Sequence, residues 1–254
     1  MSISQHHNEW LSLIEISGPF LSLPVLNRTF PQGLETVQPA LRQDLRAAYE
    51  EWRDNQGGVR ADPAIHRAWI EWVLTDLLTM DDEVLIRNQS ARVNKKMETP
   101  TDHFAVTVPE HGETLRPDFT VVNPSLAHHP GGIEKGTENK VGRLLVMIVP
   151  PGQDLDKPLK GQRWAASPAT RMMLLLHGTG VRLGLVTNGE QWMIVDAPQG
   201  ETTGFISWYA ELWLDEPLTL QAFVTLFNAG RFFGVAADKT IEALLTNGAS
   251  LRKS

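Results

Sequence analysis

The chain has 254 residues, enough for one large domain or two small ones. Hydrophobic residues make up 42% and charged residues 21%, an ordinary balance for a globular protein. The net charge of −7 argues against a nucleic-acid binder that uses its whole surface, and the lack of cysteine excludes disulfides and cysteine-ligated metal sites. The N-terminus has no signal-peptide pattern and no apolar run is long enough to span a bilayer, so we expect a cytoplasmic protein without membrane contact.

The first 95 residues predict a helical N-terminal subdomain. The segment "QPALRQDLRAAYEEWRD" has Pro39 in its first turn and Gly57-Gly58 beyond its end, as helices commonly do. The segment "ADPAIHRAWIEWVLTDLL" is the clearest helix, because Asp62 can cap it and Pro63 suits its first turn. Its apolar residues share one face: Ile65, Trp69, Trp72, Val73 and Leu77.

Strand patterns begin near residue 100. The segments "HFAVTV" and "RPDFTVV" predict a hairpin, with "EHGETL" as its turn. The run Leu144 to Val149 has no polar face, which predicts an internal strand buried on both sides. The segment "SPATRMMLLLHGTG" predicts a helix that Ser167 caps and that ends near Gly178 or Gly180.

The segment "VRLGLVTNGEQWMIVDA" gives the strongest local signal, because Asn188-Gly189 is the preferred pair for a type I′ hairpin turn. A further strand, "FISWYAELWL", and two terminal helices follow. The order of elements predicts an α/β fold in two parts: the helical subdomain at 1–95, and an α/β domain at 96–254 that includes the C-terminal helices.

Over roughly residues 60–250, these segments resemble restriction-endonuclease-like domains at the N-terminus of fused restriction–modification proteins. The resemblance rests on "RPDFTVV", "RLLVMIVPPGQDLDKP", "GVRLGLVTNGEQWMIV" and "LTLQAFVTLFNAGRFFGV". The family it points to is the N-terminal region of adenine methyltransferases of fused type II restriction and DISARM-type phage-defence systems. It implies a restriction-endonuclease-like central mixed sheet flanked by helices.

In such nuclease domains a Pro-Asp opens one strand and a Glu-x-Lys follows on the next. Two carboxylates there bind one Mg²⁺, which activates a water molecule, and the lysine stabilises the developing charge. Asp118 matches the first carboxylate, but Met147-Ile148-Val149 stands where Glu-x-Lys should fall. The resemblance therefore implies a degenerate domain without catalysis, and we expect no cofactor.

An active Mg²⁺-dependent endonuclease is the alternative. The triplet "ENK" supplies Glu138 and Lys140, so that Asp118, Glu138 and Lys140 would be catalytic and Asp118 and Glu138 would bind Mg²⁺. This triplet precedes the strand instead of lying on it. Asp154 and Asp156, beyond the strand, are a second possible source of a metal ligand.

A basic cluster after the strand contains the candidate DNA contacts Lys157, Lys160, Arg163 and Trp164. A solvated surface explains the same cluster equally well. The chain lacks the Asn/Asp-Pro-Pro-Tyr/Phe motif of adenine methyltransferases, so it cannot be the methyltransferase itself.

Three functions follow: a non-catalytic nuclease-like domain that contacts DNA or a methyltransferase partner, an active endonuclease, or a structural docking module. The amphipathic segment at the C-terminus predicts that the chain is a fragment or half of a split system, with a separately folded adenine methyltransferase as its partner.

Overall fold

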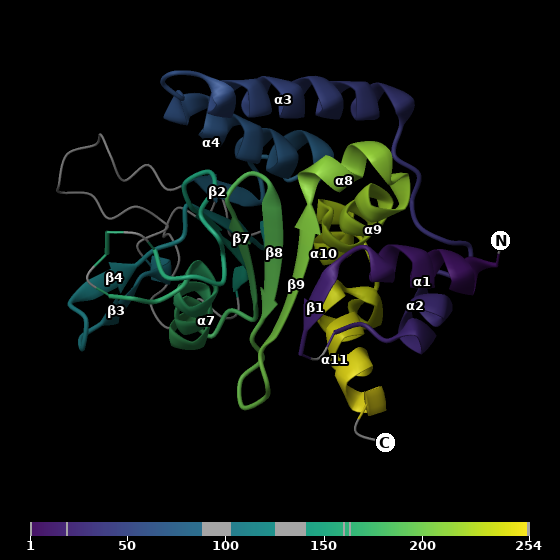
Figure 1. Cartoon of the computed structure of the whole chain (residues 1–254). Coiled ribbons are helices and arrows are strands. Elements are labelled where there is room, and N and C mark those ends of the chain that lie inside the picture. Colours follow the sequence, from purple (N-terminus) through teal and green to yellow (C-terminus); the bar gives the residue numbers. More distant parts are fainter. Residues whose placement is uncertain are drawn as a thin grey trace. The chain divides into compact units, whose positions relative to one another are not determined.

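The protein is described by a computed structural model that covers residues 2–18, 20–87, 103–124, 141–159, 161–162 and 164–252. Within these residues the fold is mixed α/β, and its larger sheet has seven strands with helices on its flanks (Figure 1). The expected α/β class with a mixed sheet is confirmed. No helix in the same ranges combines the length and the apolar character that crossing a membrane requires.

The strands of the larger sheet follow the order β1-β9-β8-β7-β6-β5-β2. Their bounds are Glu15–Ser17 (β1), Leu85–Arg87 (β2), Phe119–Val122 (β5), Gly142–Ile148 (β6), Leu183–Thr187 (β7), Gln191–Asp196 (β8) and Gly204–Tyr209 (β9). β6 pairs in parallel with β7 and antiparallel with β5, and β2 and β1 pair antiparallel with β5 and β9. A parallel pair needs a crossover connection, which contains helix α7 (Pro168–Thr179).

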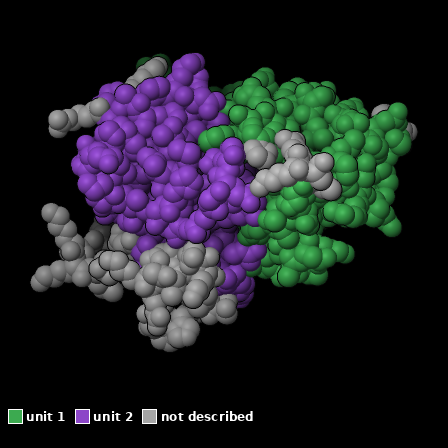
Figure 2. Space-filling view, turned by 90° about the horizontal axis from the view of Figure 1, so that it is seen from below, with its two compact units in different colours: residues 1–79, 189–192, 204–254 green, residues 80–188, 193–203 purple. Residues whose placement is uncertain are grey.

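The chain divides into two compact units, each discontinuous in sequence (Figure 2). Unit 1, green in the figure, contains residues 1–79, 189–192 and 204–254. Unit 2, purple, contains residues 80–188 and 193–203. The domain boundary expected near residue 95 falls within 88–102, outside the described residues. Unit 1 groups the N-terminal helices with the last helices of the chain, whereas the sequence pattern places the latter in the second domain.

Unit 1 is mainly helical. Its helices are α1 (Ile3–Ser12), α2 (Leu23–Thr29), α3 (Pro39–Gly57), α4 (Pro63–Trp72), a π-helical turn (Val73–Leu77), α8 (Ala210–Asp215), α9 (Pro217–Phe227), α10 (Ala229–Phe233), a 3₁₀ turn (Ala237–Lys239) and α11 (Ile241–Arg252). As predicted, α3 begins at Pro39, and the Asp62 side chain caps α4 by accepting the Ala64 N–H at 2.8 Å.

Aromatic side chains form much of the core of unit 1. Trp69 and Trp192 are buried, and both indole N–H groups donate to the Gly189 carbonyl, at 2.7 and 3.2 Å. Gly189 has a φ of 90°, and a Cβ at this position would lie 2.7 Å from the Trp52 ring. Only glycine combines this backbone conformation with so close an approach.

The core of unit 2 is built on β6. Leu144, Leu145 and Val146 are fully buried, which confirms the prediction of a strand covered on both faces. The prediction for α7 is also confirmed: the Ser167 hydroxyl accepts the Thr170 N–H at 3.1 Å, and the helix ends at Gly180 in the left-handed conformation.

The predicted hairpin of "HFAVTV" with "RPDFTVV" is wrong. β3 (Val106–Val108) pairs instead with β4 (Glu113–Leu115) in a separate two-stranded sheet, and β5 joins the larger sheet between β6 and β2. The turn takes residues 109–112, and the last three residues of "EHGETL" form β4. Pro117, which has no N–H to donate, separates β4 from β5.

The connection of β7 to β8 is also not the predicted type I′ turn. That turn needs a positive φ at both central residues, and Asn188 is not among the residues that have one. The connection takes three residues, 188–190. The Asn188 side chain donates to the Gln153 carbonyl at 2.8 Å, so its amide anchors the loop that follows β6.

Candidate nuclease-like site

A cavity of about 450 Å³ in unit 2 contains the first predicted catalytic position. It is lined by β4, by Asp118 at the start of β5, by the C-terminal end of β6 with the loop that follows it, and by Arg171 of α7. Its volume falls within the range of small-ligand sites. This cavity is therefore the place at which to test the predicted chemistry.

Asp118 directly precedes β5 and is fixed against β6. Its backbone N–H donates to the Val146 carbonyl at 2.7 Å, and its side-chain Oδ2 accepts the Ile148 N–H at 2.8 Å. The hydrogen bond to Ile148 extends the β5–β6 ladder through a side chain. The structure thus brings Asp118 together with the segment in which Glu-x-Lys would fall, and one carboxylate oxygen binds the backbone there.

The segment Met147-Ile148-Val149 lines the same cavity. Met147 and Val149 are buried and Ile148 is half-buried. None of these side chains can bind a hard cation or transfer a proton, because Mg²⁺ requires oxygen ligands. This wall of the cavity therefore supplies no second carboxylate.

Glu113 of β4 is the second carboxylate that lines the cavity, and the sequence did not reveal it. It forms a fork with Arg171, with contacts at 2.5 Å and 3.5 Å. Arg171 is almost fully buried and also donates to the Trp164 carbonyl at 3.1 Å. A carboxylate held by a buried guanidinium is already neutralised, so Glu113 is poorly placed to bind a metal ion.

Asp154 and Lys157 form a local ion pair in the loop after β6. Lys157 Nζ lies 2.6 Å from Asp154 Oδ2, and the Asp156 N–H donates to Asp154 Oδ1. The lysine is the main cause of a lowered pKa at Asp154, and the carboxylate raises the pKa of Lys157. Neither Asp154 nor Asp156 belongs to the lining of the cavity.

Trp164 is half-buried and has aromatic and cationic neighbours. The His111 ring stacks on it, with centroids 4.6 Å apart and planes 14° apart, and the Arg171 guanidinium carbon lies 4.4 Å from the indole centroid. His111, which stacks on Trp164, is exposed. A nucleobase that stacked on the indole ring in its place would have to displace this exposed histidine.

Four of the predicted site residues lie outside the described residues: Glu138, Lys140, Lys160 and Arg163. Of the predicted catalytic set, only Asp118 can therefore be placed. Among the residues that the structure describes, no group of three or more His, Asp or Glu side chains is arranged to hold a metal ion.

Comparisons with known proteins gave no relative: no family model, no curated protein and no solved structure matches the chain. The kinship with restriction-endonuclease-like domains therefore depends on the sequence segments that carry the resemblance. It stays a prediction.

Proposed function

We propose that the chain is a non-catalytic, nuclease-like domain of a DNA restriction–modification or phage-defence protein, which contacts DNA without cutting it. An adenine methyltransferase domain or subunit is the proposed partner that acts on the DNA. The nuclease-like character is supported by the cavity of unit 2. The methyltransferase partner is supported by the resemblance alone.

The position of Asp118 supports the nuclease-like part of the proposal. The residue follows Pro117 and directly precedes β5, and the next strand along the chain, β6, pairs with β5. The resemblance implies this arrangement, with the acid at the start of one strand and the catalytic triplet on the following strand. Asp118 and Met147-Ile148-Val149 line one cavity, as such a site requires.

The absence of catalysis rests on one observation: within the described part of the chain, the two carboxylates that line the cavity are both engaged with the protein. Asp118 accepts the Ile148 N–H, and Glu113 is paired with Arg171. Magnesium-assisted hydrolysis needs carboxylates that are free to bind the ion. The active endonuclease is the alternative, and it depends on Glu138 and Lys140, which lie outside the described residues.

A salt titration of DNA binding tests the proposed contact. Duplex binding through phosphates weakens as salt rises, and the slope of log affinity against log salt becomes shallower by about one for each phosphate contact removed. We expect shallower slopes for Lys157→Gln, Lys160→Gln and Arg163→Gln. Lys239→Gln, an exposed lysine of unit 1, is the matched control.

The outcome is decided by the comparison with this control. Equal slopes in all four variants would reject the basic cluster as the DNA contact. No binding at low salt would reject the DNA-contacting role and favour the structural docking module.

A further inference from the structure

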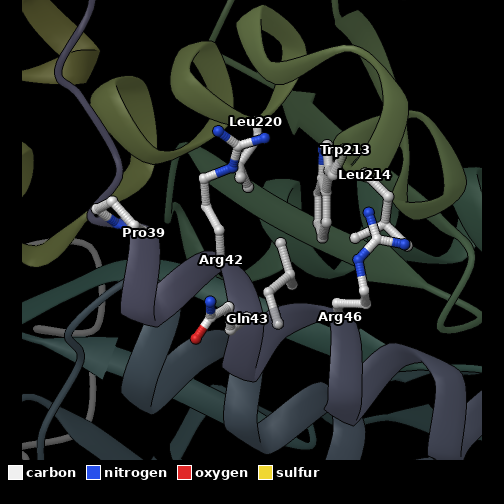
Figure 3. Close-up of a pocket in the computed structure, with 8 residues that line it drawn as sticks. Pro39, Arg42, Gln43, Arg46, Trp213, Leu214 and Leu220 are labelled. Atoms are coloured by element: carbon white, nitrogen blue, oxygen red, sulfur yellow. The ribbon is translucent and has the colours of Figure 1, made fainter.

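A second cavity, of about 250 Å³, lies in unit 1 and is distinct from the nuclease-like site (Figure 3). Residues of α3, α8 and α9 line it. Among the residues that the structure describes, its charged lining residues are Arg42 and Arg46, both from α3, and none of the lining residues is acidic. The wall is otherwise largely apolar, with Leu45, Leu220 and Trp213 among its residues.

The two arginines are spaced to act on one ligand. They are four residues apart on α3, which places them on the same helix face one turn apart. Figure 3 shows both guanidinium groups extending from α3 toward the elements that carry Trp213 and Leu220. Both guanidinium groups therefore border the same cavity.

These positive charges are poorly compensated within the protein. The Arg42 side chain is exposed and has no hydrogen bond or ion pair with any residue that the structure describes. Arg46 has a 3.7 Å contact with Glu50, in which both side chains are about half exposed. Such an exposed pair contributes little to stability, so a ligand can displace it at small cost.

Trp213 forms part of the wall of the cavity. Its side chain is almost fully buried, and its indole N–H has no acceptor among the described residues. The indole nitrogen itself has almost no accessible surface, so the ring meets the cavity through its apolar atoms. Trp213 therefore contributes an apolar surface beside the two guanidinium groups.

We propose that this cavity binds a phosphate monoester. The dianionic phosphate matches the two guanidinium charges, and its terminal oxygens accept from Arg42 and Arg46. The apolar wall receives a small aromatic or aliphatic ester body. The same group occurs in small metabolites and at the 5′ end of a nucleic acid strand. The proposal does not rest on the nuclease-like role, because it concerns unit 1.

Calorimetric titration of the whole chain with phenyl phosphate tests the proposal at constant ionic strength. We expect saturable binding at one site that phenol does not reproduce. Arg42→Gln and Arg46→Gln should each weaken binding at least about tenfold, the loss expected for one charge-assisted hydrogen bond. Arg28→Gln makes the same charge change at an exposed arginine of unit 1 outside the cavity, and it should leave the affinity unchanged.

The indole has a matched control of its own. Trp208 is also fully buried, and its N–H has no partner among the described residues, but it does not line the cavity. Trp213→Phe should weaken binding without unfolding the chain, because phenylalanine keeps most of the apolar volume, whereas Trp208→Phe should not change affinity. Equal losses in both variants would reject Trp213 as part of the wall that contacts the ligand. Absent binding, or equal losses in all three arginine variants, would overturn the proposal.

Oligonucleotides separate the two sources of the phosphate. Tighter binding of a 5′-phosphorylated strand than of its 5′-hydroxyl counterpart, lost in Arg42→Gln, would assign the site to nucleic acid ends. Equal binding of the two strands, together with saturable phenyl phosphate binding, would assign it to a small metabolite.

Discussion

The hydroxyl group of Tyr49 donates a 2.6 Å hydrogen bond to the carboxylate of Glu190, across 141 residues of sequence. The other oxygen of Glu190 accepts the Glu211 N–H at 2.9 Å. One carboxylate in unit 1 therefore links α3 to the start of β8 and to α8. Burial, and then Glu190 itself, raise the pKa of Tyr49 well above its ordinary value, so the hydroxyl keeps its proton across the physiological range.

The link of Tyr49 to Glu190 should be measurable as a coupling energy. Tyr49→Phe should lower the free energy of unfolding by about 1.5 to 3 kcal/mol, because it removes a hydrogen bond to a charged acceptor. A double-mutant cycle with Glu190→Gln, followed by urea unfolding at pH 7, gives the pairwise term. A coupling near zero would show that the bond does not hold the two segments together.

His7 should make the protein acid-sensitive. The side chain is fully buried, and Nδ1 accepts the Trp10 indole N–H at 3.1 Å. Protonation of Nδ1 would set its N–H against the Trp10 indole N–H, so that two donors would face each other. The pKa of His7 is lowered, and burial is the largest cause. Because the folded pKa lies below the unfolded value of 6.5, the unfolded state binds more protons, and stability falls as pH drops below about 6.5.

The test compares unfolding free energies between pH 7 and pH 5. We expect a flatter pH profile for His7→Asn, which removes the titrating ring and keeps an acceptor for Trp10. His6→Asn, one residue away on α1, should retain the slope of the wild type. Parallel profiles for the wild type and His7→Asn would show that another group causes the acid sensitivity.

Arg171 should be important for the stability of unit 2. Arg171→Met leaves Glu113 and the Trp164 carbonyl without the donor they now share, and breaking a buried ion pair typically costs about 3 to 5 kcal/mol. Arg171→Lys should recover little, because an ammonium group cannot reproduce the planar fork and the stacking on Trp164. Urea unfolding measures both variants, with Arg28→Met as the exposed control. A loss of unfolding free energy below about 1 kcal/mol in Arg171→Met would contradict this role.

The buried strand β6 gives a sharper contrast. Val146 is fully buried, so Val146→Asp places an unpaired charge in the core at a cost of several kcal/mol and should abolish cooperative unfolding. Val59→Asp makes the same change at a fully exposed valine and should leave the transition unchanged. Circular dichroism during thermal unfolding reads both, and a folded Val146→Asp variant with the wild-type midpoint would show that β6 tolerates the charge.

Local sequence patterns predicted those parts of the fold that local chemistry determines. Ser167, Asp62 and Pro39 mark helix starts because caps and first-turn prolines act on their own helix. The unbroken apolar run at Leu144 predicted a buried strand because no polar residue can face solvent there. The hairpin was misassigned because "ETL" is too short for its alternation to distinguish a strand from a turn.

The candidate site was only partly predictable for the opposite reason. Asp118 carries a motif, but the Glu113–Arg171 pair joins residues 58 positions apart, and no local pattern encodes such a pairing. The available signal was Arg171, a single charged residue directly before the apolar run "MMLLL", because a buried charge needs a partner. Arg42 and Arg46 likewise read as solvated helix positions until α8 and α9 are seen to complete a cavity around them.

The central claim is that Asp118 serves the fold and not a metal ion, and a plasmid-nicking assay tests it most directly. Purified chain is incubated with supercoiled plasmid and Mg²⁺ or Mn²⁺, alongside Asp118→Asn and Asp118→Ala. We predict no nicking above the protein-free control in any sample, and lower unfolding free energies for both variants because the Ile148 N–H loses its charged acceptor. Metal-dependent nicking by the wild type that disappears in Asp118→Ala would contradict the account and establish the endonuclease with Glu138 and Lys140 as the residues to test next.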